Sequence, residues 1–172
     1  DTNETAKYLF KSDNWCNSSE KIQLAEAIAV DDEYRTATLS VLNYIGDFFL
    51  VDSITEAKKA LQLLQDDKKG RTAIIAKELI QQAPSKAISG KSLFDVIRCD
   101  NSTAQVLQNI LGSCLIVDNL DAAISAVQSG NCDYAVAMSG ELVHKSGYIL
   151  GGSFQKSDSG KLGKKEKMDS LK

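Results

Sequence analysis

The sequence has few of the residues from which metal and nucleophilic sites are built. It contains one histidine, His144, and four cysteines, none of which forms a C-x-x-C pair. A structural zinc site needs closely spaced pairs of ligands, so no metal site is expected. The single histidine has no sequence neighbour that would complete an acid–base pair, and we expect it to lie in a solvent-exposed turn.

Long apolar runs and an excess of positive charge are also missing. No apolar run is long enough to span a membrane, and the first residues do not resemble a signal peptide. The 172 residues carry a formal net charge of −3, so a basic surface for nucleic acid can only be local. Residues 85–92 approach the phosphate-binding loop motif, but Ser85 replaces its first glycine. We therefore expect no cofactor, no membrane and no small-molecule substrate.

One unit of sequence occurs twice. Residues 44–61 align without a gap on residues 110–127, so that Gly46 matches Gly112 and Val51 matches Val117. The similarity continues on both sides of this block. Two copies with a long period indicate two related lobes rather than a solenoid.

Each copy alternates between helical and strand patterns. Apolar residues at helical spacing, continuous apolar runs and capping residues mark the elements. The alternation predicts an α/β fold with mainly parallel or mixed sheets. The expected elements are a helix from Tyr34 to Ile45 between Asp31 or Asp32 and Gly46, a strand over 48–51, a helix after a capping box at Ser53, a strand over 72–76, a helix over 102–111, a strand over 114–117, a helix over 120–128 capped by Asn119, and a strand over 134–138.

Asp52 and Asp118 each follow a buried apolar run and precede a helix. Catalytic groups often lie at such strand ends, so a small α/β enzyme with a cleft near these aspartates is one alternative. Carboxylates just before a helix also interact favourably with its free amides. Because the position occurs in both copies, the structural role is favoured, and we expect a non-catalytic protein.

Lysines are concentrated near the C-terminus. They are mixed with serine, glycine and aspartate, which is typical of a solvated, frayed end. The alternative is a local patch that binds DNA phosphates weakly. The candidate residues of this patch are Lys156, Lys161, Lys164, Lys165 and Lys167.

The segment SGYILGGS, residues 146–153, lies outside the repeated unit. Tyr148, Ile149 and Leu150 have the character of a strand, and the glycines on both sides let another backbone approach closely. A strand that the first copy lacks is expected at the edge of a sheet. An exposed edge of this kind needs a partner.

At this point the chain resembles the hinge domain of structural maintenance of chromosomes (SMC) proteins, of the bacterial type. The resemblance extends from about Trp15 to Gly152 and is most specific in LGSCLIVDNLDAAISA and ELVHKSGYILGG. The family often has Thr or Ser before the double glycine, where this chain has Leu150. The matching positions are Leu111, Gly112, Val117, Asp118, Leu120, Ala123, Gly140, Leu142, Gly147, Gly151 and Gly152.

The resemblance implies an SMC hinge fold, with two pseudo-symmetric α/β lobes whose mixed sheets are flanked by helices. It also implies that two hinges, expected to be identical chains, pair the edge of one lobe with the other lobe of the partner. No catalytic residue and no cofactor is implied, because the ATPase heads of SMC proteins are made elsewhere in the full chain. The residues expected at the contact are Gly147, Tyr148, Ile149, Leu150, Gly151 and Gly152, with Thr72, Ala73, Ile74 and Ile75 as the partner strand.

By the same resemblance the chain divides into five segments. Residues 1–19 and 155–172 would lead to the coiled-coil arms, residues 20–84 and 96–154 would form the lobes, and residues 85–95 would connect them. The expected function is to join two SMC chains into a V- or ring-shaped complex that organises chromosomes, with weak DNA binding. The expected location is the cytoplasm, in association with the chromosome or nucleoid.

Overall fold

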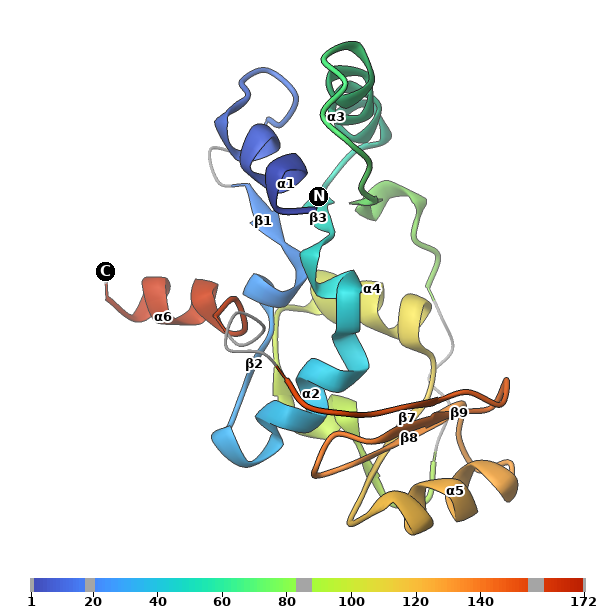
Figure 1. Ribbon diagram of the computed structural model, residues 1–172. Coiled ribbons are helices and arrows are strands. Elements are labelled where there is room, and N and C mark those ends of the chain that lie inside the picture. The colour runs from blue at the N-terminus through green and yellow to red at the C-terminus, as the bar shows by residue number, and fades with distance from the viewer. Residues whose placement is uncertain (1, 18–20, 83–87, 155–159, 172) are drawn as a thin grey trace. The chain divides into compact units, whose positions relative to one another are not determined.

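The computed structural model describes residues 2–17, 21–82, 88–154 and 160–171 (Figure 1). The chain forms two compact units, of which unit 1 contains Asp1–Leu24 and Tyr44–Gln81 and unit 2 contains Ala25–Asn43 and Gln82–Lys172. This division differs from the predicted lobes, because residues 25–43 of the first copy belong to the unit that holds the second copy. The cause is an antiparallel pairing of β2 (Ala29–Val30) with β6 (Ile97–Arg98).

Unit 1 contains a small mixed sheet with the strand order β1-β3-β4 among the described residues. The parallel strands β3 (Phe49–Val51) and β4 (Ile74–Ala76) are joined by helix α3 (Ile54–Asp66), and β1 (Ile22–Gln23) adds antiparallel to β3. The predicted capping box is present: the Ser53 side chain accepts from the Glu56 amide, and the Glu56 carboxylate accepts from the Ser53 amide.

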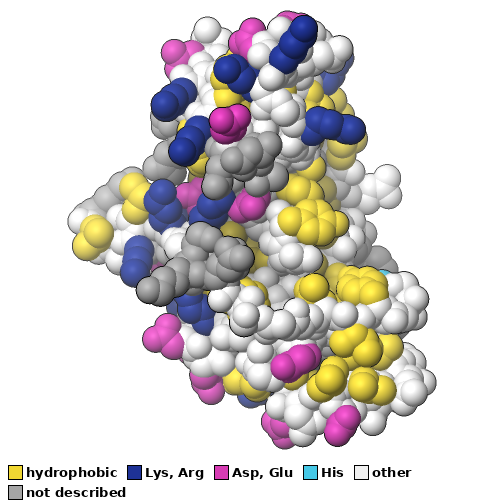
Figure 2. All heavy atoms as spheres, in the orientation of Figure 1, with side chains coloured by type: hydrophobic (Ala, Val, Ile, Leu, Met, Phe, Trp, Pro, Cys, Tyr) yellow, Lys and Arg dark blue, Asp and Glu magenta, His cyan; other side chains and the backbone are white. Residues whose placement is uncertain are grey.

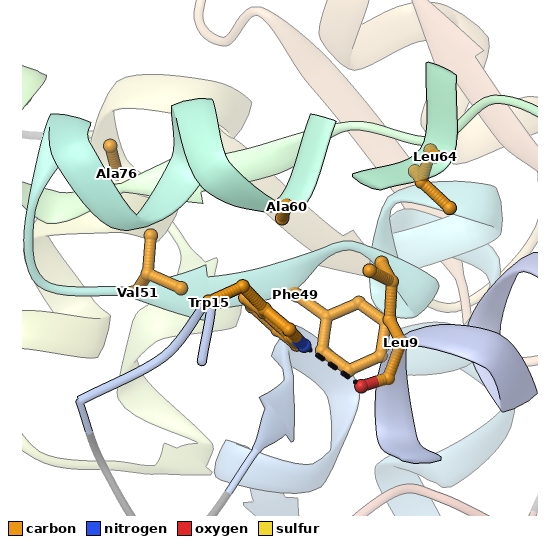
Figure 3. Packing of buried hydrophobic residues seen from close by; sticks show 7 residues of the cluster. All are labelled: Leu9, Trp15, Phe49, Val51, Ala60, Leu64 and Ala76. Carbon is orange, nitrogen blue, oxygen red and sulfur yellow. Dashed lines mark hydrogen bonds between the residues drawn. The ribbon is translucent and has the colours of Figure 1, made fainter. Parts of the chain in front are cut away.

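The core of unit 1 lies between this sheet, α3 and helix α1 (Thr2–Lys11) (Figure 3). Trp15 is 1% exposed, its ring meets Phe49 edge to face at 5.6 Å, and its Nε1–H donates to the Leu9 carbonyl at 2.9 Å. A buried indole needs such an acceptor for its N–H. Trp15 is therefore a central residue of this core.

Unit 2 contains a longer mixed sheet, with the order β10-β9-β8-β7-β5 in the described part of the chain. Its parallel pair, β7 and β8, is joined by helix α5, which packs against one face of the sheet, whereas α2 contacts β8 from the other face (Figure 1). Helix α4 precedes β7. The bounds are α2 (Arg35–Leu42), β5 (Lys91–Ser92), α4 (Asn101–Leu111), β7 (Cys114–Val117), α5 (Leu120–Gln128), β8 (Tyr134–Ala137), β9 (Leu142–His144), β10 (Ile149–Leu150) and α6 (Lys164–Ser170).

The sequence duplication is a structural duplication. Val51 of β3 pairs with Ala76 of β4, and Val117 of β7 pairs with Ala137 of β8, so the two aligned valines have equivalent places in their parallel ladders. The strands β1 and β5 also add antiparallel to β3 and β7 in the same register. Each copy is therefore a strand–helix–strand unit with one added antiparallel strand, which confirms the predicted α/β class.

The first predicted helix is shorter than expected. It ends at Leu42, where Asn43 adopts a positive φ of 48°, and Gly46 lies in the following 3-10 helix η3 (Asn43–Asp47). The predicted cap at Asp31 or Asp32 was also wrong. Asp31 precedes the 3-10 helix η2 (Asp32–Tyr34) without a side-chain cap, because its carboxylate accepts instead from Arg98 Nη1 at 2.8 Å.

Part of the C-terminal segment, where a frayed end is expected, packs within unit 2. Leu162 is 6% exposed, and a Cβ on Gly163 would come within 3.6 Å of the Ala29 Cβ. Helix α6 begins directly after this close approach. Among the residues that the structure describes, no helix has the length and apolar character needed to cross a bilayer.

Candidate protein–protein interface

Strand β10 forms one edge of the sheet of unit 2. Ile149 pairs with Val143 and Leu150 with Leu142 of β9, and within the described residues no strand adds to the other side of β10. Tyr148 and Ile149 are 53% and 57% exposed. In Figure 2, hydrophobic side chains gather over the region where Figure 1 places β9, β10 and α5. The predicted edge strand is therefore present, with exposed apolar residues on it.

The turn between β9 and β10 requires a glycine at position 147. Gly147 has a φ of 106°, a value that side chains with a Cβ rarely adopt, and its amide donates to the His144 carbonyl at 2.9 Å. The His144 amide donates in turn to the Tyr148 carbonyl at 3.0 Å. Gly147 is thus explained by the hairpin itself and does not need a partner chain to account for it.

Gly151 and Gly152 differ in whether the structure of the chain itself requires a glycine. Gly152 has a φ of 113°, so its backbone conformation accounts for the glycine. Gly151 is not among the glycines of positive φ, and a Cβ there would make only an ordinary contact of 3.6 Å with Glu141 Cγ. Its own chain therefore has room for a side chain at position 151, and the glycine is left without an intramolecular reason.

Leu150, which stands where the SMC family often has a small polar residue, is explained by the register. Residues directly opposite each other in a ladder lie on the same face of the sheet. Leu150 is opposite Leu142, which is opposite Val136, and both of these partners are buried. Leu150 therefore extends a buried apolar row to the edge of the sheet, and it is half-buried there.

The expectation that His144 lies in a solvent-exposed turn is wrong. His144 is the last residue of β9, opposite Tyr134 of β8, and is half-buried. Its ring stacks on Tyr148 with centroids 4.8 Å apart and an interplanar angle of 9°. The neighbouring sequence does not indicate this position, because it depends on how β8, β9 and β10 pair.

The predicted partner strand lies at an edge of the other sheet. In the described chain, β4 pairs with β3 alone, and its residues Ile74 and Ile75 are half-buried. Thr72 and Ala73 precede the strand. Within the described residues, β10 and β4 are therefore both edge strands with apolar residues, one in each unit.

Asp52 and Asp118 do not cap the helices that follow them. Ser53 Oγ accepts from the Glu56 amide at 3.1 Å, and Asn119 Oδ1 accepts from the Ala122 amide at 2.9 Å, so the caps are the residues after the aspartates. The Asp52 side chain is 84% exposed and lies 4.0 Å from Lys77 Nζ. In the described part of the chain, no group of acidic, histidine or cysteine side chains could hold a metal ion.

Two of the candidate DNA-binding lysines lie near carboxylates of unit 2. Lys164 Nζ lies 3.7 Å from Glu26 Oε2, and Lys165 Nζ lies 3.9 Å from Asp100 Oδ2. Lys156 is outside the described residues, whereas Lys161 and Lys167 are within them. These neighbours offset part of the positive charge on which a phosphate-binding patch would depend.

Comparisons with known proteins agree on one family. The family "SMC proteins Flexible Hinge Domain" matches residues 20–127. The chain is 31% identical over 144 residues to the chromosome partition protein Smc of Fusobacterium nucleatum, covering 78% of this chain and 12% of the relative. It is 29% identical to the structural maintenance of chromosomes protein 4 of Schizosaccharomyces pombe over 157 residues, 87% of this chain and 11% of the relative.

The fold agrees with the sequence matches. The Pyrococcus furiosus Smc hinge domain with an extended coiled coil has a TM-score of 0.76 and 29% identity, covering 98% of this chain and 60% of that one. The relatives include a fungal protein, so the bacterial type stays a prediction. The alternative of an α/β enzyme near Asp52 and Asp118 is not supported. The family match, the relatives and the fold together show that the chain belongs to the SMC hinge family, a non-catalytic dimerisation domain.

Proposed function

We propose that this chain is the dimerisation hinge that joins two SMC chains, and that β10 of one chain adds to β4 of its partner. The observation that carries the proposal is Gly151, a glycine beside an exposed strand edge that its own chain does not require. A glycine in such a position often marks a place where another backbone approaches closely.

The two edges supply complementary parts for strand addition. Main-chain hydrogen bonds across the edges would give affinity, and apolar side chains such as Ile149 and Ile75 would fix the register. Because each chain carries both edges, one in each unit, two identical chains can form two equivalent contacts related by a two-fold axis. We therefore favour a homodimer.

The larger assembly extends beyond this chain. The chain spans about one eighth of the length of the curated relatives named above. In the proposed full protein, the ATPase heads lie outside this segment, coiled-coil arms leave from residues 1–19 and 155–172, and the complex acts on chromosomes in the cytoplasm or nucleoid. DNA binding by the lysines near the C-terminus is a weak, secondary activity in this proposal.

Light scattering coupled to gel filtration tests the proposal. At micromolar concentration the chain should have twice the mass of a monomer, and dilution should not change the helix content measured by circular dichroism. A monomer under these conditions would contradict the proposal. Fluorescence anisotropy with labelled duplex DNA at low and high salt tests the secondary activity, which should fall as salt is added.

A further inference from the structure

The ring of His144 lies between two tyrosines at the base of the β9–β10 turn. Its centroid is 4.8 Å from that of Tyr148 and 4.9 Å from that of Tyr134, with interplanar angles of 9° and 37°. Tyr134 belongs to the neighbouring strand β8, whereas Tyr148 immediately precedes β10. The imidazole therefore connects the interior of the sheet to the residue that leads into the exposed edge.

The ring also holds the turn through a nitrogen. The Ser146 amide donates to His144 Nδ1 at 3.0 Å, and Ser146 Oγ lies 2.8 Å from the same atom. A backbone N–H can only donate, so this bond from Ser146 requires a lone pair on Nδ1, as the neutral form of the ring provides. This bond from a side chain to the amide two residues later is the pattern by which Asn and Asp stabilise turns.

The main chain of the same residue fixes the other side of the turn. The His144 amide donates to the Tyr148 carbonyl, and its carbonyl accepts from Gly147. One residue thus contributes its ring, its amide and its carbonyl to the turn between β9 and β10. Because β10 starts at Ile149, this turn decides where the exposed edge lies on β9.

Protonation of the ring would remove one of these bonds. The Ser146 hydroxyl can rotate and accept from a protonated Nδ1, but the Ser146 amide cannot, so two N–H groups would face each other. Stacking on Tyr148 does not select the neutral ring, because an imidazolium also packs on a phenol. The preference for the neutral form therefore comes from the backbone of the turn.

Other ionisable groups around the ring lie on β7, on β8 and in the turn. Burial raises the pKa of Tyr134 and of Cys114, its neighbour on β7, so both stay neutral. Lys145, the next residue in the chain, forms an ion pair with Asp133, in which Nζ and Oδ1 are 2.9 Å apart. A hydrogen bond from the Ser113 amide, together with Lys145, lowers the pKa of Asp133 to about 2. The chain has no other histidine.

We propose that His144 is a positioning residue for the dimer contact: its neutral ring holds the β9–β10 turn in the conformation that presents β10 to the partner, and protonation of the ring weakens the dimer. This inference rests on the proposed dimerisation and adds a regulation to it. The partner is a second copy of this chain. His144 acts through the turn, because the backbone of β10 makes the contact.

Two substitutions distinguish the contribution of the hydrogen-bond acceptor at His144 from that of its stacked ring. His144→Asn keeps an acceptor that can bond the Ser146 amide, as Asn does in turns, but has no ring. His144→Phe keeps a ring that can stack on Tyr148 but has no acceptor. The dimer dissociation constant of the wild type and both variants would be measured by analytical ultracentrifugation between pH 8 and pH 5, the interval in which imidazoles titrate.

The wild-type dissociation constant should rise as the pH falls, by about two- to tenfold, the range expected for one net hydrogen bond. His144→Asn should bind almost as tightly as the wild type at pH 8, and His144→Phe more weakly. Neither variant should show the pH dependence. An equal pH dependence in His144→Asn, or a wild-type dimer that is independent of pH, overturns the inference.

A measurement on the wild type alone covers the case in which the variants fail to fold. The imidazole nitrogen and Ser146 amide resonances can be followed by NMR during an acid titration, at concentrations that favour the monomer and the dimer. The imidazole and Ser146 amide resonances should shift together, and their titration should differ between the monomer and the dimer. Equal titration in both states overturns the inference, whereas a chain that is monomeric at every pH overturns the proposed function itself.

Discussion

Asp133 and Ser113 bind each other reciprocally at the start of the parallel strands β7 and β8. Asp133 Oδ2 accepts from the Ser113 amide at 2.9 Å, and the Asp133 amide donates to Ser113 Oγ at 2.8 Å. Lys145, the first residue of the β9–β10 turn, lies 2.9 Å from the other carboxylate oxygen. One carboxylate therefore connects the start of β7 with the turn that precedes the proposed interface.

Asp133→Asn should destabilise the fold, and the effect should depend on pH. The hydrogen bond from Ser113, and then Lys145, lowers the pKa of Asp133 from 3.8 to about 2. A carboxylate whose pKa is lowered by folding stabilises the protein above its unfolded pKa and loses this contribution as the pH falls through the folded value. We expect a loss of about 2 kcal/mol at pH 7 that shrinks between about pH 4 and pH 2.

Urea unfolding at a series of pH values measures this effect. Asp13→Asn, in an exposed part of the chain, is the matched control and should change the free energy of unfolding little. A loss in Asp133→Asn that is the same at pH 2.5 and pH 7 would show that the charge of the carboxylate is not what stabilises the fold.

The elements that depend on local sequence could be predicted, because their causes are local. The capping box at Ser53 and the cap at Asn119 were found from a few residues each, and both are present. The parallel strands were visible because a continuous apolar run suits a strand that is covered on both faces. The edge strand could be located because SGYILGG has no counterpart in the other copy.

The features that depend on distant residues could not be predicted. Strands β2 and β6 have two residues each, and their pairing, which ties residues 25–43 to unit 2, leaves no periodic pattern in the sequence. The position of His144 depends on Tyr134, ten residues earlier, which only the β8–β9 register brings opposite to it. The cap expected at Asp31 failed for the same reason, since its carboxylate binds Arg98.

Arg98 should control how firmly helix α6 is held. Its guanidinium donates from Nη1 to Asp31 at 2.8 Å and from Nε and Nη2 to Glu166 at 3.1 Å each. Single exposed ion pairs contribute little, but a bidentate pair within a network fixes geometry. Arg98→Gln should speed hydrogen exchange of the α6 amides by about two- to tenfold. High salt should move the wild type toward the variant.

Hydrogen exchange with mass spectrometry checks this prediction, with Arg71→Gln in unit 1 as the control. If α6 exchanges equally in Arg98→Gln and in the wild type, the helix is held by Leu162 and by the approach of Gly163 to Ala29. In that case the ion pairs of Arg98 with Asp31 and Glu166 would have no part in holding helix α6.

Gly151→Val should weaken the dimer without unfolding the chain. The site has room for a Cβ, which would lie 3.6 Å from Glu141 Cγ, and its backbone is outside the positive-φ region. A branched side chain would, however, occupy the space beside β10 into which we propose that the partner's backbone comes, and we expect at least about a tenfold rise in the dissociation constant.

Gly160→Val is the matched control, because a Cβ on Gly160 would meet no described atom within 4 Å and its φ is not positive. Sedimentation equilibrium gives the dissociation constants, and circular dichroism confirms that both variants are folded. An unchanged dimer in Gly151→Val would remove position 151 from the interface and with it the main support for strand addition at β10.

Cysteine cross-linking should identify β4 as the partner strand. In a background with Cys16→Ser and Cys99→Ser, one chain would carry Ile149→Cys and a second, tagged chain would carry Ile75→Cys. Cys114 and Cys132 are buried and can stay. If β10 of one chain lies beside β4 of the other, a short bismaleimide should join the two different chains. Each chain alone should give little product, because cross-linking requires the two sulfurs to be close.

In the control mixture, the second chain carries Leu61→Cys instead of Ile75→Cys. Leu61 is on helix α3, is 45% exposed and belongs to the same unit as β4. It should give little product with Ile149→Cys. Strong cross-linking of the Ile149→Cys chain to itself would indicate that two β10 strands pair with each other. Because that outcome keeps the dimer but changes its geometry, it would contradict the assignment of β4 and leave dimerisation through β10 intact.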